Sequence, residues 1–345
     1  MYDTDAIRRD HPIADVAVAS GLQLRPTGGR LVAVCPFHGD TRPSLIVYPR
    51  TRSYYCFGCG AGGDVLDFVS RLHNTSFKEA AALLQGLRLS MPVKTARPQV
   101  SEAIARVDPA MAAPIVEEAV AFYAAALWSQ PRVLSYLAAR GVGRTTARRH
   151  RLGFGVRGLA DDLRRQGLDP EVAEQLGLLR EGRERFVGRV VIPDLVGGRP
   201  TWFTGRRLDD REPRYLNLRL PKPILGLGSA TGEAVVVTEG PFDWLTTAGW
   251  GFRAVALLGT QLRASTVAVL ERFEEVYLAL DADDAGREAT EELRQRLGDR
   301  AIPVQLPAGV ADLNGLGCQP DGRQGFTRCL LEASRVARAS QRTAA

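Results

Sequence analysis

Residues 276 to 283 read Val276-Tyr277-Leu278-Ala279-Leu280-Asp281-Ala282-Asp283, a short apolar run that ends in two carboxylates. The run Val235-Val236-Val237-Thr238 ends in the same way, at Glu239. Both runs are partly β-branched or aromatic, and a helical pattern follows each, which is typical of buried strands in a parallel α/β sheet. Such sheets bind ligands at the carboxyl ends of their strands. We therefore expect the three acids to meet at one edge of a sheet.

This sheet is expected to be doubly wound, because strand and helix patterns alternate from residue 234 onward. Three carboxylates in its cleft would repel one another unless a cation neutralised them. Hard oxygen ligands suit Mg²⁺ or Mn²⁺, so the sequence predicts a divalent metal site. The alternative is that these acids only cap the helices that follow their strands. The expected strands are 235–238, 254–258, 276–280 and 302–306.

Composition and charge narrow the class of protein. The chain has 345 residues, 45% apolar and 24% charged, which is ordinary for a globular protein of two or three domains. We expect a cytoplasmic protein without a membrane contact, because no apolar run approaches the roughly 20 residues that span a bilayer and the N-terminus lacks a signal pattern. Residues 91–230 carry 23 basic and 15 acidic groups, whereas residues 231–345 carry 12 and 16. A positive surface beside a carboxylate site suggests an anionic polymer held over a metal centre.

Two ligand pairs near the N-terminus predict a zinc site. Cys35-Pro36-Phe37-His38 and Cys56-Phe57-Gly58-Cys59 each hold two potential ligands, and 17 residues separate the pairs. This spacing predicts one tetrahedral, structural Zn²⁺ bound by Cys35, His38, Cys56 and Cys59. Strands expected at 44–48 and 53–55 make the segment a zinc ribbon. The alternative is a group of free thiols around a core histidine.

The same ribbon carries aromatic and basic residues that could bind single-stranded nucleic acid by stacking and ion pairing. The alternative is that the rings pack inside the ribbon and the charges are solvated. These residues are Phe37, Arg42, Arg50, Arg52, Tyr54 and Tyr55.

The chain divides into five expected parts. Residues 92–114 contain four prolines and no sustained apolar period, which is typical of a linker. A helix is expected to begin near Ile115 and to run through Leu127 and Trp128 to Pro131, and a hairpin is expected around the turn Gly197-Gly198. The parts are a zinc-binding domain (1–91), a linker (92–114), a basic domain of mixed helix and strand (115–231), the doubly wound α/β domain (232–335) and a flexible tail (336–345).

Three groups of residues carry a family resemblance. They are Cys35 to His38, Thr41 to Ser44 and Tyr55 to Asp64; Arg185 to Pro193, Gly205 to Leu208 and Arg214 to Asn217; and Glu239-Gly240, Leu258-Gly259-Thr260 and Asp281 to Arg287. In that order they resemble the CHC2 zinc domain, the basic half of the RNA polymerase domain, and the Toprim domain of bacterial DnaG-type DNA primases. The resemblance implies a DNA-dependent RNA primase that makes short primers on single-stranded DNA from NTPs.

The resemblance also implies roles for individual residues. Asp281 and Asp283 would be direct Mg²⁺ or Mn²⁺ ligands, and Glu239 a third ligand or the group that positions or deprotonates the attacking hydroxyl. Asp243 and Asp312 would help to hold a second ion. The residues expected to bind nucleic acid or nucleotide are Arg185, Arg189, Arg206, Arg214, Tyr215, Asn217 and Lys222. Expected partners are the template, NTPs, the RNA primer/DNA hybrid and a helicase supplied in trans.

The sequence departs from the family pattern at three places. Pro241 replaces the usual tyrosine after Glu239-Gly240, and the acidic pair after the last strand is reduced to Asp312 in Asp312-Leu313-Asn314. The chain also stops soon after the Toprim part, which favours a plasmid, phage or other mobile-element primase that lacks the helicase-binding domain. Two other functions stay open: a non-catalytic protein that binds single-stranded DNA, and a metal-dependent Toprim nuclease.

Overall fold

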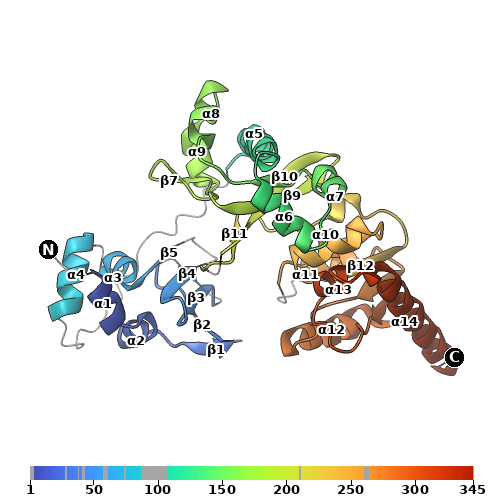
Figure 1. Ribbon diagram of the computed structural model, residues 1–345. Coiled ribbons are helices and arrows are strands. Elements are labelled where there is room, and N and C mark those ends of the chain that lie inside the picture. Colours follow the sequence, from blue (N-terminus) through green and yellow to red (C-terminus); the bar gives the residue numbers. More distant parts are fainter. Residues whose placement is uncertain are drawn as a thin grey trace. The chain divides into compact units, whose positions relative to one another are not determined.

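The structure, a computed structural model, describes residues 4–27, 29–37, 39–40, 43–56, 61–73, 75–86, 107–209, 211–259 and 264–344. It forms two compact units, which we describe separately (Figure 1). The N-terminal unit is Met1–Val107 with Arg207–Leu216, and the C-terminal unit is Asp108–Arg206 with Asn217–Ala345.

The N-terminal unit is built on an antiparallel sheet of order β1-β2-β3-β4-β5. The predicted ribbon hairpin is confirmed, because β3 pairs with β4 and Val47 faces Tyr54. The turn between them closes with a hydrogen bond from Arg52 N to Pro49 O. The elements are α1 (Thr4–Asp10), α2 (Ile13–Ala19), β1 (Arg25–Thr27), β2 (Arg30–Ala33), β3 (Leu45–Tyr48), β4 (Ser53–Cys56), β5 (Gly62–Gly63), α3 (Val65–His73) and α4 (Phe77–Gly86).

An aromatic cluster fills the core of this unit. The rings of Phe37, Tyr54 and Phe68 lie with their centroids 5.2 to 5.6 Å apart. Tyr54 is only 1% exposed and Tyr55 8% exposed. Neither ring is therefore available to stack on a base, and the structure supports the alternative of packing inside the ribbon. Arg42 lies outside the described residues.

The first half of the C-terminal unit is a long helix on a sheet of order β10-β9-β6, and β10 also pairs with β11, of which only Asn217 belongs to this unit. The predicted hairpin is confirmed as β9 and β10, which flank the turn at Gly197-Gly198. The elements are α5 (Pro109–Leu127), α6 (Pro131–Ala139), α7 (Arg144–Arg149), β6 (Gly153–Phe154), α8 (Leu159–Arg165), α9 (Pro170–Gln175), β7 (Leu179–Arg180), β8 (Arg183–Glu184), β9 (Arg189–Val196), β10 (Arg199–Arg207) and β11 (Tyr215–Asn217).

Helix α5 begins at Pro109, so the expected linker boundary at residue 114 and helix start at Ile115 are wrong. Asp108 caps the helix, because its side chain accepts a hydrogen bond of 2.9 Å from Ala110 N. Proline is tolerated in a first helical turn, where its missing N–H would have no partner. The prolines of this segment do not end the helix, because Pro109 starts it and Pro114 lies inside it. The rest of the expected linker, up to residue 106, lies outside the described residues.

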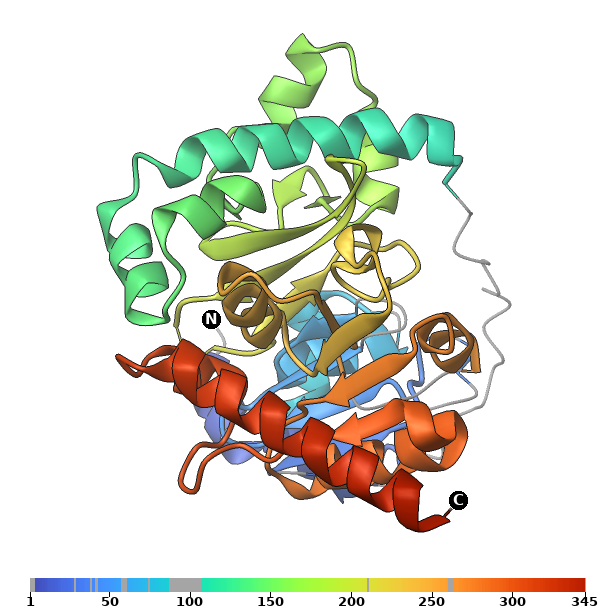
Figure 2. The same cartoon turned by 90° about the vertical axis from the view of Figure 1, so that its right-hand side faces the viewer.

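By length and composition, α5 is the one helix among the described residues that could cross a membrane. One face of it is buried instead, with Ile115, Val116, Ala119, Val120 and Tyr123 each 2% exposed or less. This face packs on β6 and β9, and Figure 2 shows α5 lying across the strands of this half. The spacing of the buried residues is that of a core helix.

The second half of the C-terminal unit is a parallel sheet of order β13-β12-β14-β15. Helices α11 and α12 contact each other, whereas α10 contacts α13 and α13 contacts α14. This division into two helical groups fits right-handed crossovers on both faces of the sheet, and it confirms the doubly wound prediction. The elements are β12 (Ala234–Thr238), α10 (Pro241–Gly249), β13 (Ala254–Ala256), α11 (Ala264–Leu270), β14 (Glu275–Leu278), α12 (Asp284–Leu297), β15 (Ala301–Pro303), α13 (Leu313–Gly317) and α14 (Gly322–Ala344).

The expected flexible tail is wrong, because α14 continues as a helix through Ala344. The stretch is rich in alanine and arginine, which favour helix. Tertiary contacts add to this preference: Phe326 is buried against Trp250 and Phe252, and the Ser334 hydroxyl lies 2.8 Å from the Tyr277 hydroxyl.

Helix α7 joins the two halves of the C-terminal unit by packing on α10. The His150 ring, at the end of α7, lies edge-on to Trp244 of α10 at 4.6 Å. Its Nε2 is buried without a hydrogen-bond partner among the described residues. Burial, followed by the charge of Arg149, lowers the pKa of His150 to about 4.

We therefore expect acid to destabilise the C-terminal unit through His150. The unfolded chain binds a proton below about pH 6.5, whereas the folded unit does so only below about pH 4. Stability is thus complete above pH 6.5 and is lost as the pH falls toward 4. Between pH 7 and pH 5 the parent should lose about 2 kcal/mol more than a His150→Phe variant. All four tryptophans lie in the C-terminal unit, so urea unfolding followed by tryptophan fluorescence measures this difference. Equal pH dependence of parent and variant would contradict the expectation.

Candidate active site and zinc ribbon

The predicted acids follow neighbouring strands. β12 pairs with β14 in parallel, with Val237 opposite Leu278, so Glu239 and Asp281 follow at the same edge of the sheet. Asp283 begins α12 and Asp243 lies in the first turn of α10. Gly286 lets the chain turn tightly after Asp281, because a side chain at this position would meet the Asp281 carbonyl at 2.0 Å.

The carboxylates at this edge act on one another electrostatically. Burial raises the pKa of Asp281 to about 8, together with the charges of four neighbouring carboxylates. These are Asp243, Glu239, Asp312 and Asp283. Burial, with the charges of Asp283 and Asp243, raises the pKa of Glu239 to about 6. Burial is also the main reason that the pKa of Asp243 rises to about 6. Without a counterion, the carboxylates at this edge therefore cannot all be ionised at the same time.

The donor set fits a hard divalent cation, although the side chains are not arranged as a ready site. Within the described residues, no three acidic, histidine or cysteine side chains converge on one point. One oxygen of Glu239, Oε2, is buried without a hydrogen-bond partner in the described part of the chain. A buried carboxylate oxygen of this kind needs a proton or a cation. An ion that binds here must draw the carboxylates together.

Two of the predicted ligands also cap helices, as the alternative interpretation expected. Asp283 Oδ1 accepts a hydrogen bond of 2.8 Å from Gly286 N at the start of α12. Asp312 Oδ1 accepts one of 2.5 Å from Gly315 N at the start of α13. Each carboxylate has a second oxygen, so a capping role and a metal-ligand role are compatible.

Asn314, which stands where the family pattern has a second acid, is a buried connector. Its backbone N–H donates to Asp243 Oδ1 at 2.8 Å. Its side-chain oxygen accepts from Arg140 Nη1 at 3.1 Å, and its Nδ2 donates to Arg140 O at 2.8 Å and to Thr246 Oγ1 at 3.0 Å. Only 4% of Asn314 is exposed. Asn314 therefore connects the second half of the C-terminal unit, which contains the parallel sheet, to the end of α6 in the first half.

We expect Asn314→Ala to destabilise the C-terminal unit by about 2–3 kcal/mol. The substitution removes three side-chain hydrogen bonds and leaves buried polar partners unsatisfied. The midpoint of thermal unfolding, followed by tryptophan fluorescence, should fall by roughly 5–10 °C. Asn217→Ala is the matched control, because the Asn217 side chain accepts a hydrogen bond from Thr204 Oγ1 within the same half. A variant as stable as this control would show that Asn314 does not join the halves.

The predicted nucleic-acid residues differ in accessibility. Arg189 is 3% exposed and donates to Gly205 O at 3.1 Å, and Arg206 is 8% exposed and donates to the Tyr136 hydroxyl at 2.8 Å. Both therefore hold the fold together, and burial excludes Arg189 from the direct contact predicted for it. The other predicted residues are half-buried or exposed, namely Arg185, Arg214, Tyr215, Asn217 and Lys222.

Among the predicted basic residues, Lys222 is linked through two hydrogen bonds to the strand end that carries Glu239. Its Nζ donates to Leu258 O at 2.6 Å, and Leu258 N donates to Glu239 O at 2.9 Å. Leu258 has a positive φ of 59°, which is strained for a leucine and is common at functional sites. A strained turn thus places a cation beside the carboxylate edge.

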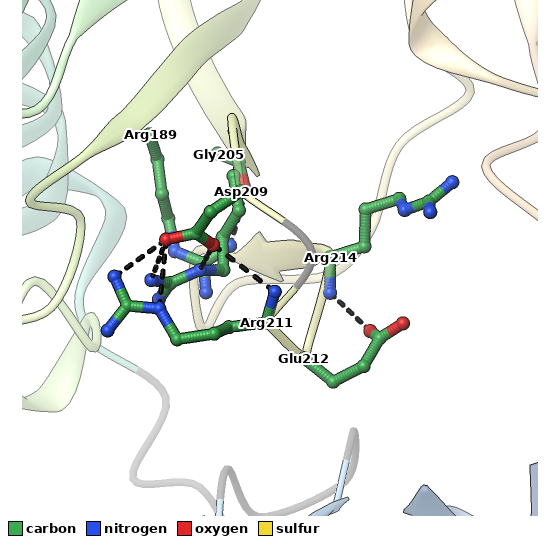
Figure 3. Close-up of polar contacts among 7 residues, drawn as sticks. Arg189, Gly205, Asp209, Arg211, Glu212 and Arg214 are labelled. Atoms are coloured by element: carbon green, nitrogen blue, oxygen red, sulfur yellow. Dashed lines mark hydrogen bonds and ion pairs between the residues drawn. The ribbon is translucent and has the colours of Figure 1, made fainter. Parts of the chain in front are cut away.

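The loop after β10 neutralises part of its own positive charge (Figure 3). Asp209 accepts hydrogen bonds from the guanidinium groups of Arg207 and Arg211. The hydrogen bond from Arg207 is the main reason that the pKa of Asp209 falls far below its usual range. Glu212 accepts from Arg214 N at 2.6 Å, and the Arg214 side chain points away from this cluster.

Arg140, at the end of α6, has a structural role that the sequence did not indicate. Its guanidinium lies over the rings of Tyr136 and Phe242, at 5.6 and 5.7 Å from their centroids. Arg206 lies over the same Phe242 ring at 5.0 Å. An arginine four residues after a tyrosine in a helix was the only local signal of this stacking.

The zinc ribbon has two of its predicted ligands in the described residues. Cys35 and Cys56 are 3% and 0% exposed. Phe37 N donates to Cys35 Sγ at 3.4 Å, and the Ser44 hydroxyl lies 3.3 Å from Cys56 Sγ. Buried sulfurs with hydrogen-bonding neighbours fit thiolate ligands of zinc. His38 and Cys59 lie outside the described residues.

Comparison with known families gives three matches along the chain. Residues 2–99 match the CHC2 zinc finger, residues 122–220 match the N-terminal domain of the DNA primase catalytic core, and residues 236–316 match the Toprim-like family. These three ranges follow the order that the sequence resemblance predicted.

Individual primases are similar over most of the chain. The DNA primase of Aquifex aeolicus is 33% identical over 333 residues, which cover 89% of this chain and 62% of the relative. The chain spans about half the length of several other curated primases that it matches.

Solved primase structures share the fold. The zinc-binding and RNA polymerase domains of the Aquifex aeolicus primase match with a TM-score of 0.56 and 29% identity, over 96% of this chain and 85% of that one. A DnaG primase catalytic domain bound to ssDNA matches with a TM-score of 0.53 and 25% identity, over 65% and 78% of the two chains. The three domain matches in their common order, together with these relatives, show that the chain belongs to the DnaG-type DNA primase family.

Proposed function

We propose that this chain is a DNA-dependent RNA primase, which joins NTPs into short primers on a single-stranded DNA template. The observation that carries the proposal is the sheet edge at which Asp281, Glu239 and Asp243 all have raised pKa values. Such an excess of carboxylates has a use where divalent cations must bind beside phosphate groups. The ssDNA bound to the related catalytic domain supports a template strand as the polymer.

The reaction that we propose is attack of a 3′-hydroxyl on the α-phosphate of an NTP, with pyrophosphate as the leaving group. Mg²⁺ or Mn²⁺ held by Asp281, Asp283 and Glu239, and a second ion held by Asp243 and Asp312, would stabilise the charge that develops on the phosphate. Glu239 would act either as that third ligand or as the group that positions or deprotonates the attacking hydroxyl. Lys222 and Arg214 would bind phosphate oxygens of the nucleotide and of the template.

The N-terminal unit would hold one structural zinc through Cys35, His38, Cys56 and Cys59. The buried, hydrogen-bonded sulfurs of Cys35 and Cys56 support this assignment. Four protein ligands leave no open position on the ion, so this zinc would stabilise the ribbon without taking part in the reaction.

Primer synthesis on single-stranded DNA tests the proposed function. Templates of mixed sequence, NTPs with one labelled nucleotide, and Mg²⁺ or Mn²⁺ should yield short RNA products that require the template. Cleavage of labelled DNA without added nucleotides would instead identify a nuclease. Tight binding of single strands with no product on any template would identify a non-catalytic binding protein.

A further inference from the structure

A long stretch of the basic half contains no acidic residue. Between Glu118 and Asp161 the sequence has seven arginines and neither aspartate nor glutamate. The stretch runs from α5 through α6 and α7 to the start of α8. Figure 2 shows α6 and α7, in green, at the C-terminal end of α5.

Two of these arginines share one aromatic ring. The guanidinium groups of Arg144 and Arg148 lie over the indole of Trp128, at 5.9 and 4.9 Å from its centroid. The two arginines are one helical turn apart on α7, and both are exposed. The opposite face of α7 is buried, with Ala147 1% exposed and His150 against Trp244. The packed face therefore fixes α7, and the stacked face points toward solvent.

Two other arginines of the stretch have polar partners within the C-terminal unit. Arg151 pairs with Glu117 at 2.6 Å, and Arg140 is bound to Asn314. In contrast, Arg132, Arg144, Arg148 and Arg149 are exposed and have no acidic partner within the described residues. On α8, by comparison, Arg164 and Arg165 each pair with an aspartate three residues earlier.

Like charges one turn apart destabilise a helix, and two arginines on one ring also restrict each other. Such an arrangement gains free energy when an anion binds to both guanidinium groups, because each can donate two parallel hydrogen bonds to phosphate oxygens. Trp128 holds the two side chains in place, so less side-chain entropy is lost on binding. Because the guanidinium groups cover the indole, phosphate contact fits this surface better than base stacking.

We propose that Arg144 and Arg148, with Arg149 next to them in the sequence, form a second nucleic-acid contact that binds the phosphodiester backbone outside the carboxylate edge. This surface, which we call the Trp128 arginine surface, binds without sequence preference. The inference deepens the proposed primase function by assigning a separate anchor for its DNA. Either the template strand or the primer–template duplex could supply the backbone, since both present the same phosphates.

Salt-dependent binding of DNA tests the surface. The probes are a fluorescent 20-nucleotide oligothymidine and a fluorescent 20-base-pair duplex, titrated by anisotropy between 50 and 200 mM KCl without NTPs or divalent ions. For Arg144→Gln plus Arg148→Gln we expect the slope of log affinity against log salt to fall by about 1.4 for the single strand or about 1.8 for the duplex. Affinity at 50 mM KCl should fall by more than about tenfold.

The matched control is Arg164→Gln plus Arg165→Gln, which removes the same charge from arginines that already have acidic partners. This control should keep the parent slope. A parent-like far-ultraviolet circular dichroism spectrum and unfolding temperature check that the test variant folds, and the single variant Arg148→Glu should weaken binding in the same direction. A larger loss with oligothymidine assigns the surface to the template, and a larger loss with the duplex assigns it to the primer–template.

Two results would overturn the inference. One is an equal loss of slope in the test and control variants, which would mean that only net charge matters. The other is unchanged DNA binding together with lost binding to vesicles that contain phosphatidylserine, which would make the surface a membrane contact. The assay contains no NTPs, so a failure of primer synthesis does not affect it. Conversely, a parent that makes primers while the test variant keeps the parent salt slope would refute this surface and leave the proposed primase function standing.

Discussion

Replacing both Asp281 and Asp283 by alanine should abolish template-dependent primer synthesis, with a rate loss of about a thousandfold or more. Stabilisation of phosphoryl charge by a metal ion is worth several kcal/mol, and each 1.36 kcal/mol corresponds to a factor of ten in rate. The measurement is the initial rate of labelled primer formation with Mg²⁺ and with Mn²⁺. Activity within a few-fold of the parent would show that neither residue is a metal ligand of the proposed site.

Asp284→Ala is the matched control for this double variant. Asp284 follows Asp283 as the first residue of α12, its side chain is 93% exposed, and its partner is Arg287. It is not among the carboxylates that raise the pKa of Asp281. The control should keep its rate within about twofold, because an exposed ion pair contributes little. A large loss in this control would mean that the loop, and not the metal ligands, had been disturbed.

Metal binding gives a second measurement that does not depend on activity. Without metal, the folded protein holds a proton on Asp281 up to about pH 8, whereas the unfolded chain releases it near pH 3.8. Stability from this group is therefore full at low pH and is lost as the pH rises toward 8. Mg²⁺ should raise the unfolding temperature more at pH 8 than at pH 6, because protons compete with it at the lower pH. The double variant should show no such shift.

Removal of zinc should unfold the N-terminal unit and leave the C-terminal unit folded. A structural zinc contributes on the order of 10 kcal/mol, more than the whole stability of a small domain. Cys56→Ser, or treatment of the parent with a strong chelator, should therefore expose residues 4–86 to protease and lower the helical circular dichroism signal. The four tryptophans lie only in the C-terminal unit, so their fluorescence should not change.

The control for this experiment uses the two cysteines outside the ribbon. Cys318→Ser and Cys329→Ser should leave zinc content and protease resistance unchanged, because neither residue lies in the N-terminal unit. If chelation left the N-terminal unit resistant to protease, the proposed structural role of zinc would be wrong.

The sheet and its acids were predictable because their signals are local. An apolar run followed at once by Glu239 or Asp281 identifies a strand and its end within ten residues. The ribbon hairpin was predictable for the same reason, since ligand spacing and short strands occur together. The start of α5 was harder to predict, because proline inside a helix usually breaks it. Only the cap at Asp108 shows that this helix begins before Pro114.

The connections between halves were not predictable, because they join residues far apart in sequence. Asn314 contacts residues 71 and 174 positions away, and nothing near it in the sequence indicates either partner. Arg140 and Arg189 look like ordinary surface charges until packing places one on Phe242 and buries the other. A helical wheel can identify a shared face, but it cannot say what covers that face.

The Arg140–Asn314 connection limits how this protein can exchange parts with its relatives. A recombinant that took α6 from one primase and the segment around α13 from another would separate two residues that bind each other through both side chain and backbone. Such a chimaera would keep every carboxylate of the edge and still lose the side-chain contacts between the two halves. The boundary between the halves is therefore a poor crossover point, and we expect the two residues to be inherited together.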